Sequence, residues 1–312
     1  MSYRLFAVAF LAAVLSGCFD QPGASQSYLP PAPAPSTAPS FSVNRVHKRV
    51  HNAAVPRYVY VTDRGNGQLL VYPFGVSNPA PIRSIPLDSP LGVTVDSAGS
   101  VYVAQWAESQ ISVFNDGATA QTGTITTNVD RPTSITADSS GNLFVDNQPA
   151  NGTPVIREYA PGNYAQIRSI SVSGDNTLCG GVAVNQGGAV FSDVTVPGQT
   201  VFLSEVYPIY QVIWGSGGCG GVAVTDGGNI IQGDLSVVAT FSTLYKRTRW
   251  QDFQPWGDIK FLTANDGAIA IPFSNIHTGQ PAVVEAESDS SSAPWVITLP
   301  AGAFPGGAVV GP

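Results

Sequence analysis

The sequence has few charged residues, few histidines and few cysteines. Only 11% of its 312 residues are Asp, Glu, Lys or Arg, and it contains three His and three Cys. From Tyr58 onward there are nine of the 14 Lys and Arg but 20 of the 21 Asp and Glu, a formal net charge of −11. An acidic surface repels phosphate backbones, so we expect no nucleic acid partner.

The recurring catalytic motifs are missing. We find no G-x-S-x-G elbow, no Walker loop and no pair of histidines at metal-ligand spacing. His277 is the only histidine after Tyr58, and an isolated histidine is more often a surface loop residue than a base. The sequence therefore indicates no catalytic residue and no metal ligand.

Long apolar runs are also missing, apart from one near the start. Leu5 to Leu15 is an apolar run of eleven residues that follows Arg4. It is too short to span a bilayer and has the length of a signal-peptide core. The run ends in Leu15-Ser16-Gly17-Cys18, which resembles a bacterial lipobox. We expect residues 1–17 to be a lipoprotein signal peptide and Cys18 to carry the lipid; the alternative is an ordinary signal peptide that ends near a cysteine.

Residues 18–56 show no hydrophobic period. They contain the Pro/Ala/Ser tract SYLPPAPAPSTAPS, which is stiff, polyproline-like and suited to a disordered tether behind the lipidated Cys18. Asp20 is third in the expected mature chain rather than second, so by analogy the inner-membrane retention signal is absent. The predicted location is the bacterial cell envelope, with the protein lipid-anchored on the outer membrane or the cell surface.

The rest of the chain is a set of repeats. The phrase GVTVDSAGSVYVAQ, two β-branched strands around a turn, returns with changes four times. The matching first-strand positions are Gly92, Ser134, Gly181, Gly221 and Asp258, which lie 42, 47, 40 and 37 residues apart. Repeats of about 40 residues with about four short strands each indicate a β-propeller.

The two ends of the repeat region complement each other. RYVYVTDRGNGQLLVYPFG contains a second and a third strand but lacks a first, and FPGGAVVGP resembles a first strand alone. Together they make a sixth unit, and sharing one sheet between the termini leaves no open edge. The sequence therefore predicts an all-β fold for residues 57–312: a six-bladed β-propeller with the last blade closed by N- and C-terminal strands. A β-sandwich is the alternative, but it does not explain the two half-repeats.

The segment PLGVTVDSAGSVYVAQWAESQISVF resembles the NHL repeat, whose members show P-x-G-[IV]-A-V-D, G-N-[IVL]-Y-V-[AT]-D and R-I-x-V-F. The resemblance implies a six-bladed propeller and says little about function, because such propellers include ligand-binding scaffolds and enzymes. The related lyases rely on histidines and acids around a divalent metal. With His277 alone, their site cannot be transferred to this sequence.

Two cysteines stand at the same point of a repeated phrase. CGGVAV begins at Cys179 and again at Cys219, just before first strands of neighbouring repeats. The glycines that follow let the two backbones approach closely near the centre of the ring. Lipidation of Cys18 leaves an even number of cysteines in an exported chain, the setting in which disulfides persist. A Cys179–Cys219 disulfide, two buried thiols and a soft-metal pair all remain open.

Polar residues recur at the ends of the second strands, on the face where the first strands begin. They are Asp63, Gln105, Asp146, Asp193 and Asp234. Asn147 follows Asp146, and resemblance to the lactonases of this family, which use a Glu/Asn/Asp metal site, leaves a site among Asp146, Asn147 and Asp193 open. One hypothesis is an anionic rim that binds a cation, an amine or a sugar. The other is that each Asp opens a loop and accepts backbone N–H groups, which is the commoner role of Asp in turns.

We therefore expect a monomeric, envelope-anchored lipoprotein whose propeller binds or scaffolds a protein or glycan partner, with no cofactor. The alternative is a metal-dependent propeller enzyme of the lactonase or lyase type, with a divalent cation in the central channel. Three or more side chains around one ion would distinguish that enzyme from a binding protein.

Overall fold

The computed structural model describes residues 56–171, 177–196, 199–204, 211–213, 221–225, 230–234, 237–241, 247–252, 258–259, 263–265, 268–274, 281–287 and 295–312. Side chains are described over 56–171, 181–192, 221–225, 230–231, 268–273, 281–283 and 295–312. All of them belong to one compact unit, Lys48–Pro312. The expected signal peptide, Cys18 and most of the tether lie outside the described residues. Within those residues, no helix has the length and hydropathy needed to cross a bilayer.

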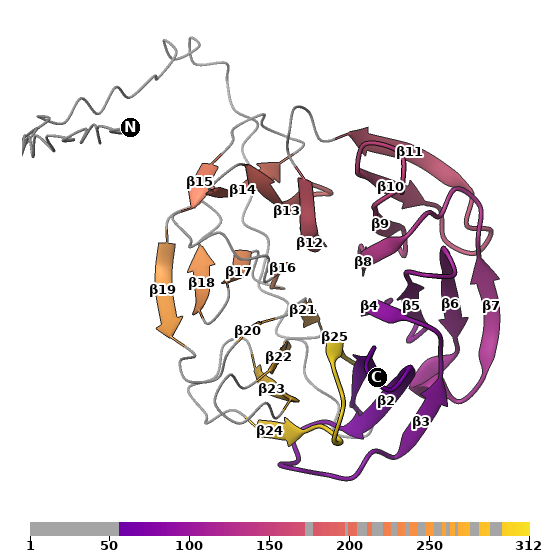
Figure 1. Cartoon of the computed structure of the whole chain (residues 1–312), viewed down its shortest axis with the longest axis vertical. Coiled ribbons are helices and arrows are strands. Elements are labelled where there is room, and N and C mark those ends of the chain that lie inside the picture. The colour runs from indigo at the N-terminus through magenta and orange to yellow at the C-terminus, as the bar shows by residue number, and fades with distance from the viewer. Residues whose placement is uncertain are drawn as a thin grey trace, which may run out of the picture. The chain divides into compact units, whose positions relative to one another are not determined.

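The described strands form six antiparallel sheets (Figure 1). The first has the order β25-β1-β2-β3, with β25 Pro305–Gly311, β1 Tyr58–Asp63, β2 Gln68–Pro73 and β3 Arg83–Pro86. The second contains β4 Pro90–Val95, β5 Val101–Gln105, β6 Gln110–Phe114 and β7 Gln121–Ile125. The third contains β8 Pro132–Ala137, β9 Leu143–Asn147, β10 Val155–Tyr159 and β11 Gln166–Ser171.

The second half of the chain continues the pattern. The fourth sheet contains β12 Thr177–Val184, β13 Val190–Val196, β14 Gln199–Ser204 and β15 Gln211–Ile213. The fifth contains β16 Val222–Val224, β17 Ile230–Asp234, β18 Val237–Phe241 and β19 Arg247–Asp252. The sixth contains β20 Asp258–Ile259, β21 Thr263–Asn265, β22 Ala268–Ser274, β23 Pro281–Glu287 and β24 Trp295–Thr298. Here the first strand is divided, because β20 and β21 both pair with β22.

Strands from the two ends of the repeat region share the first sheet. β25 pairs antiparallel with β1, from Tyr58↔Gly311 to Asp63↔Pro305. The Tyr60 hydroxyl donates a hydrogen bond of 2.6 Å to the carbonyl of Pro312. These contacts join segments about 250 positions apart in the chain.

Alternation along the strands accounts for the packing between sheets. Val59 and Val61 of β1 pack with Ala270 and Val283 of the sixth sheet. Tyr60, which lies between the two valines, packs instead with side chains of the second sheet such as Val103. Successive side chains of a strand point to opposite faces, so alternate residues of β1 pack against the two sheets on either side of it.

The first strands of successive sheets contact one another: β25 contacts β4, β4 contacts β8, β8 contacts β12, and β12 contacts β16. In Figure 1 these strands face a common centre, and the later strands of each sheet lie farther out. A β-carbon at Gly92 would lie 2.8 Å from Cα of Ser134, and one at Gly181 would lie 2.5 Å from the amide nitrogen of Val222. Only residues without a side chain allow backbones this close.

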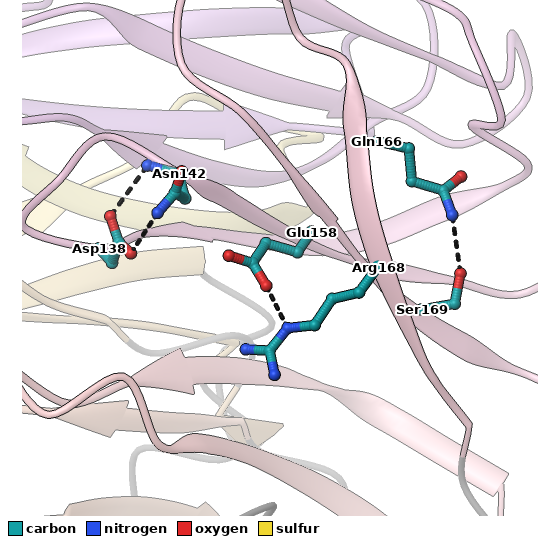
Figure 2. Close-up of polar contacts among 6 residues, drawn as sticks. All are labelled: Asp138, Asn142, Glu158, Gln166, Arg168 and Ser169. Carbon is teal, nitrogen blue, oxygen red and sulfur yellow. Dashed lines mark hydrogen bonds and ion pairs between the residues drawn. The ribbon is translucent and has the colours of Figure 1, made fainter.

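Turns between first and second strands use one recurring side-chain contact. Asp96 Oδ1 accepts from the amides of Ala98 and Ser100, at 2.9 Å each. Asp138 accepts from Ser140 and Asn142 in the same way. Each Asp side chain therefore accepts hydrogen bonds from two turn amides that have no strand partner. Figure 2 shows Asp138 with Asn142, and also the ion pair between Glu158 of β10 and Arg168 of β11, which ties together the two outer strands of the third sheet.

Candidate functional site

One edge of the sheets collects the residues that the sequence singles out. The end of each second strand pairs with the start of the first strand: Asp63 with Pro305, Gln105 with Pro90, and Asn147 with Pro132. The loops after the second strands and the segments before the first strands therefore meet at this edge. We call it the loop edge.

Asp63 at the loop edge is a structural residue. Its side chain is fully buried. Oδ1 accepts from the amides of Phe304, at 3.0 Å, and Asn66, at 3.2 Å. Oδ2 accepts from the side-chain nitrogens of Asn66, at 2.8 Å, and Gln68, at 3.0 Å. With four donors around it, this carboxylate holds the loop in place, which is the second of the two roles considered for it above.

Gln105 and Asn147 occupy the position equivalent to Asp63 in the next two sheets, and both are buried. Gln105 donates to the carbonyl of Asp88 at 3.1 Å and accepts from Ser112. Asn147 Oδ1 accepts from the amide of Asp130 at 2.8 Å. Like Asp63, these side chains fix the loops at the loop edge.

Asp146 differs from the residues above. It stands one position earlier than Asn147, and its register partner is Ser134. A shift of one residue turns a side chain to the other face of its sheet. Asp146 is fully buried, and neither of its carboxylate oxygens has a partner at good hydrogen-bond geometry among the described residues, although the side chains of Thr133 and Gln148 lie close enough to interact with it. Burial raises its pKa to about 7, although Thr133 and Gln148 favour the ionised form.

The remaining predicted residues are described in part or not at all. Asp193 pairs with Gly181, which places it at the register position of Asp146. Asp234 lies two positions after Gln232, which pairs with Val222 of β16. The backbone of Cys179 lies in β12 at a register shift between Leu178 and Gly181. The side chains of these three residues, and Cys219 as a whole, lie outside the described part of the structure. The disulfide therefore stays a prediction.

The residues just after the second strands form a repeated set. Arg64, Trp106 and Gln148 each donate their amide to the carbonyl of the residue before a first strand. The acceptors are Phe304 at 2.9 Å, Ser89 at 3.1 Å and Arg131 at 3.2 Å, respectively. Three neighbouring sheets thus present six side chains on the same backbone frame.

Two arginines of this set, Arg64 and Arg131, lie over the ring of Trp106. The guanidinium carbon of Arg131 lies 5.0 Å from the centroid of the Trp106 ring, and that of Arg64 lies 5.7 Å from it. Both distances lie within the range of cation–π attraction. We call Arg64, Trp106 and Arg131 the Arg-Trp-Arg cluster. Arg64 is exposed, and the other two are half-buried.

The cluster contains cations without carboxylate partners. The ion pair seen in the described part of the chain joins Glu158 to Arg168. Glu158 pairs with Phe144, toward the end of β9 that lies opposite the loop edge. No acidic side chain of the described residues pairs with Arg64 or Arg131. Among those same residues, no three His, Cys, Asp or Glu side chains gather as a metal ion would require.

Sequence reasoning missed the Arg-Trp-Arg cluster. Its members come from three repeats, 42 and 25 positions apart, and no local motif joins them. The available signal was positional: Arg64 and Trp106 directly follow the equivalent residues Asp63 and Gln105. Aligning the repeats one residue further would have placed Arg64 and Trp106 at matching positions.

No family model matches the chain, and no curated protein matches it. Solved structures do. A protein of unknown function from Bacteroides caccae is similar with a TM-score of 0.62 and 12% identity, over 82% of this chain and 99% of that one. A chain of a nidogen/laminin complex is similar with a TM-score of 0.62 and 11% identity, over 81% of this chain and 98% of that one. At such identities the likeness shows the fold alone, which is all-β and β-propeller-like.

Proposed function

We propose that this chain is a lipid-anchored protein of the bacterial cell envelope whose six-bladed, NHL-like β-propeller binds a partner at the loop edge. The pairing of β25 with β1 supports a ring closed by the terminal strands, and the successive contacts of first strands support six blades. The lipobox-like Leu15–Cys18 and the Pro-rich tract support the anchor and the tether.

The observation that carries the binding function is the Arg-Trp-Arg cluster. Its backbone positions are held by repeated hydrogen bonds between loops, while its guanidinium groups have no carboxylate partner in the described residues. Rigid loops that present Arg and Trp side chains are typical of binding surfaces, where these residue types contribute most of the energy.

Two measurements test this function. Cys18→Ala should move the protein from the membrane fraction to the soluble fraction, whereas Cys179→Ser should leave it on membranes; retention of the Cys18 variant contradicts the anchor. The purified protein should bind members of a peptide and glycan panel saturably, without turnover of a lactone panel. Lactone hydrolysis that requires an added divalent ion would overturn the binding function in favour of an enzyme.

A further inference from the structure

We propose that the Arg-Trp-Arg cluster is a recognition site for carboxylate groups of an acidic peptide segment that also carries apolar side chains. This inference rests on the binding function proposed above and specifies its ligand. Positive charge is scarce in this part of the protein and is concentrated at the cluster. From Tyr58 onward the chain has only nine Lys and Arg against 20 acids, yet two of those nine lie over a single indole ring.

The geometry of the cluster leaves its hydrogen-bond donors available. A guanidinium group has five N–H donors, and the attraction between its charge and the face of a ring does not require them. Among the described residues, the side chains of Arg64 and Arg131 make no hydrogen bond or ion pair. Both groups can therefore bind a carboxylate with two parallel hydrogen bonds, which is the strongest form of this contact.

The backbone holds the cluster before any ligand arrives. The backbone of Arg64 is fixed by the hydrogen bond that its amide donates to the carbonyl of Phe304. It is also fixed by the close packing of Gly65, where a β-carbon would lie 2.2 Å from the carbonyl oxygen of Gly302. The amide of Arg131 donates to Ser109 Oγ at 3.1 Å, and Ser109 belongs to the same loop as Trp106. A site that is already ordered loses less conformational entropy when it binds.

An acidic peptide fits these surroundings better than an acidic glycan. Sugars contact aromatic residues through the flat face of the ring, but two guanidinium groups already lie over Trp106. The apolar area at this edge comes instead from Phe304, which is 44% exposed and bonded through its backbone to Arg64. A ligand that places carboxylates against the two arginines and an apolar side chain against Phe304 has the composition of a peptide segment.

The experiment uses the purified full-length protein and an array of synthetic peptides with Glu and Phe on a Gly/Ser background. Each peptide has a counterpart with Gln in place of Glu, and oligogalacturonate serves as the glycan probe. We expect binding that requires Glu, gains from Phe and weakens with added salt, because the charges are exposed. Arg64→Gln and Arg131→Gln should each weaken binding about tenfold, given the usual strength of a charge-assisted hydrogen bond.

Arg157→Gln is the matched control, because it removes one cation from β10, outside the cluster, and should leave binding unchanged. Trp106→Phe reports whether the ring orients both arginines; it should weaken binding less than the double arginine substitution.

Equal binding of Glu and Gln peptides, or full binding by the double variant, overturns this site. Stronger binding of oligogalacturonate than of any peptide also overturns it, while the proposed binding function would survive. Absence of binding to peptides, glycans and envelope extracts alike would overturn both.

Discussion

Gly92 of β4 lies directly against Ser134 of β8: a β-carbon added at Gly92 would be 2.8 Å from Cα of Ser134 and 2.9 Å from the carbonyl oxygen of Thr133. Ser134 in turn accepts a hydrogen bond of 3.2 Å from the amide of Val182 in β12. Three first strands are therefore spaced by backbone contact, and the spacing between neighbouring sheets depends on the absence of a side chain at Gly92.

Gly92→Ala should destabilise the protein. The new methyl group meets backbone atoms, which cannot move aside as a flexible side chain could, and overpacking of this kind costs about 1–3 kcal/mol. Urea unfolding followed by tryptophan fluorescence measures the difference. Gly123→Ala is the control, because its β-carbon would meet only Val113, at 4.0 Å, in an outer strand. Equal midpoints for the two variants would contradict the close approach of β4 and β8.

The repeats and their turns could be predicted from the sequence, because they depend on local patterns. Alternating apolar residues specify strands that pack against two neighbouring sheets, and Asp96 and Asp138, which follow first strands at the turns, accept hydrogen bonds from the turn amides. The Arg-Trp-Arg cluster could not be found in the same way. The recurring Asp63, Gln105 and Asn147 turn their side chains inward to their own loops, whereas the ligand-facing candidates are the residues beside them. Which neighbour faces outward depends on register across three sheets, and no single repeat contains that information.

Asp146 should make stability depend on pH. Its folded-state pKa of about 7 lies above the ordinary value of 3.8, so the folded protein favours the protonated form. The stability gained from that protonation is fully present below pH 4 and is lost as the pH rises through 7. A rise of about three units corresponds to about 4 kcal/mol.

Asp146→Asn should therefore unfold at higher urea than the wild-type protein at pH 8, by a margin that shrinks toward pH 4. The change of this margin with pH is the informative quantity, since the amide has its own hydrogen-bonding needs. Asp88→Asn removes an exposed carboxylate and should show no such change. A margin that is constant between pH 4 and pH 8 would mean that Asp146 is ionised in the folded protein.

Cys179 and Cys219 should resist alkylation until a reductant is added. The expectation that both cysteines come just before a first strand is wrong for Cys179, which lies within β12, whereas Cys219 comes before β16 in the sequence. These two strands approach closely, since Gly181 meets Gly221 across the gap between β12 and β16. A disulfide across the intervening ~40 residues would add roughly 4 kcal/mol by restricting the unfolded chain. Mass spectrometry after iodoacetamide treatment, with and without dithiothreitol, counts the modified cysteines. Rapid labelling of the untreated native protein would exclude the bridge.

Thr62 connects the two terminal strands to the next sheet. Its buried hydroxyl oxygen accepts from the amide of Gly307 in β25 at 2.7 Å, and the hydroxyl donates to the carbonyl of Leu91 in β4. Thr62→Val keeps the shape of the side chain but leaves both backbone groups buried without this partner. Each unsatisfied group costs about 1–3 kcal/mol, so the variant should lose several times more stability than a surface substitution.

The location of that loss tests whether β25 holds the neighbouring sheets together through Thr62. If β25 holds the repeats together, Thr62→Val should raise hydrogen exchange first in Pro305–Gly311 and then in β1 and β4, while β6 and β10 keep their protection. Thr124→Val, on the exposed strand β7, should alter none of these rates. Loss of protection confined to β2 and β3, with β25 unaffected, would show that the C-terminal strand does not depend on Thr62. The C-terminal strand would then be held by the packing of Val309 and Val310 against the neighbouring sheets rather than by this hydroxyl.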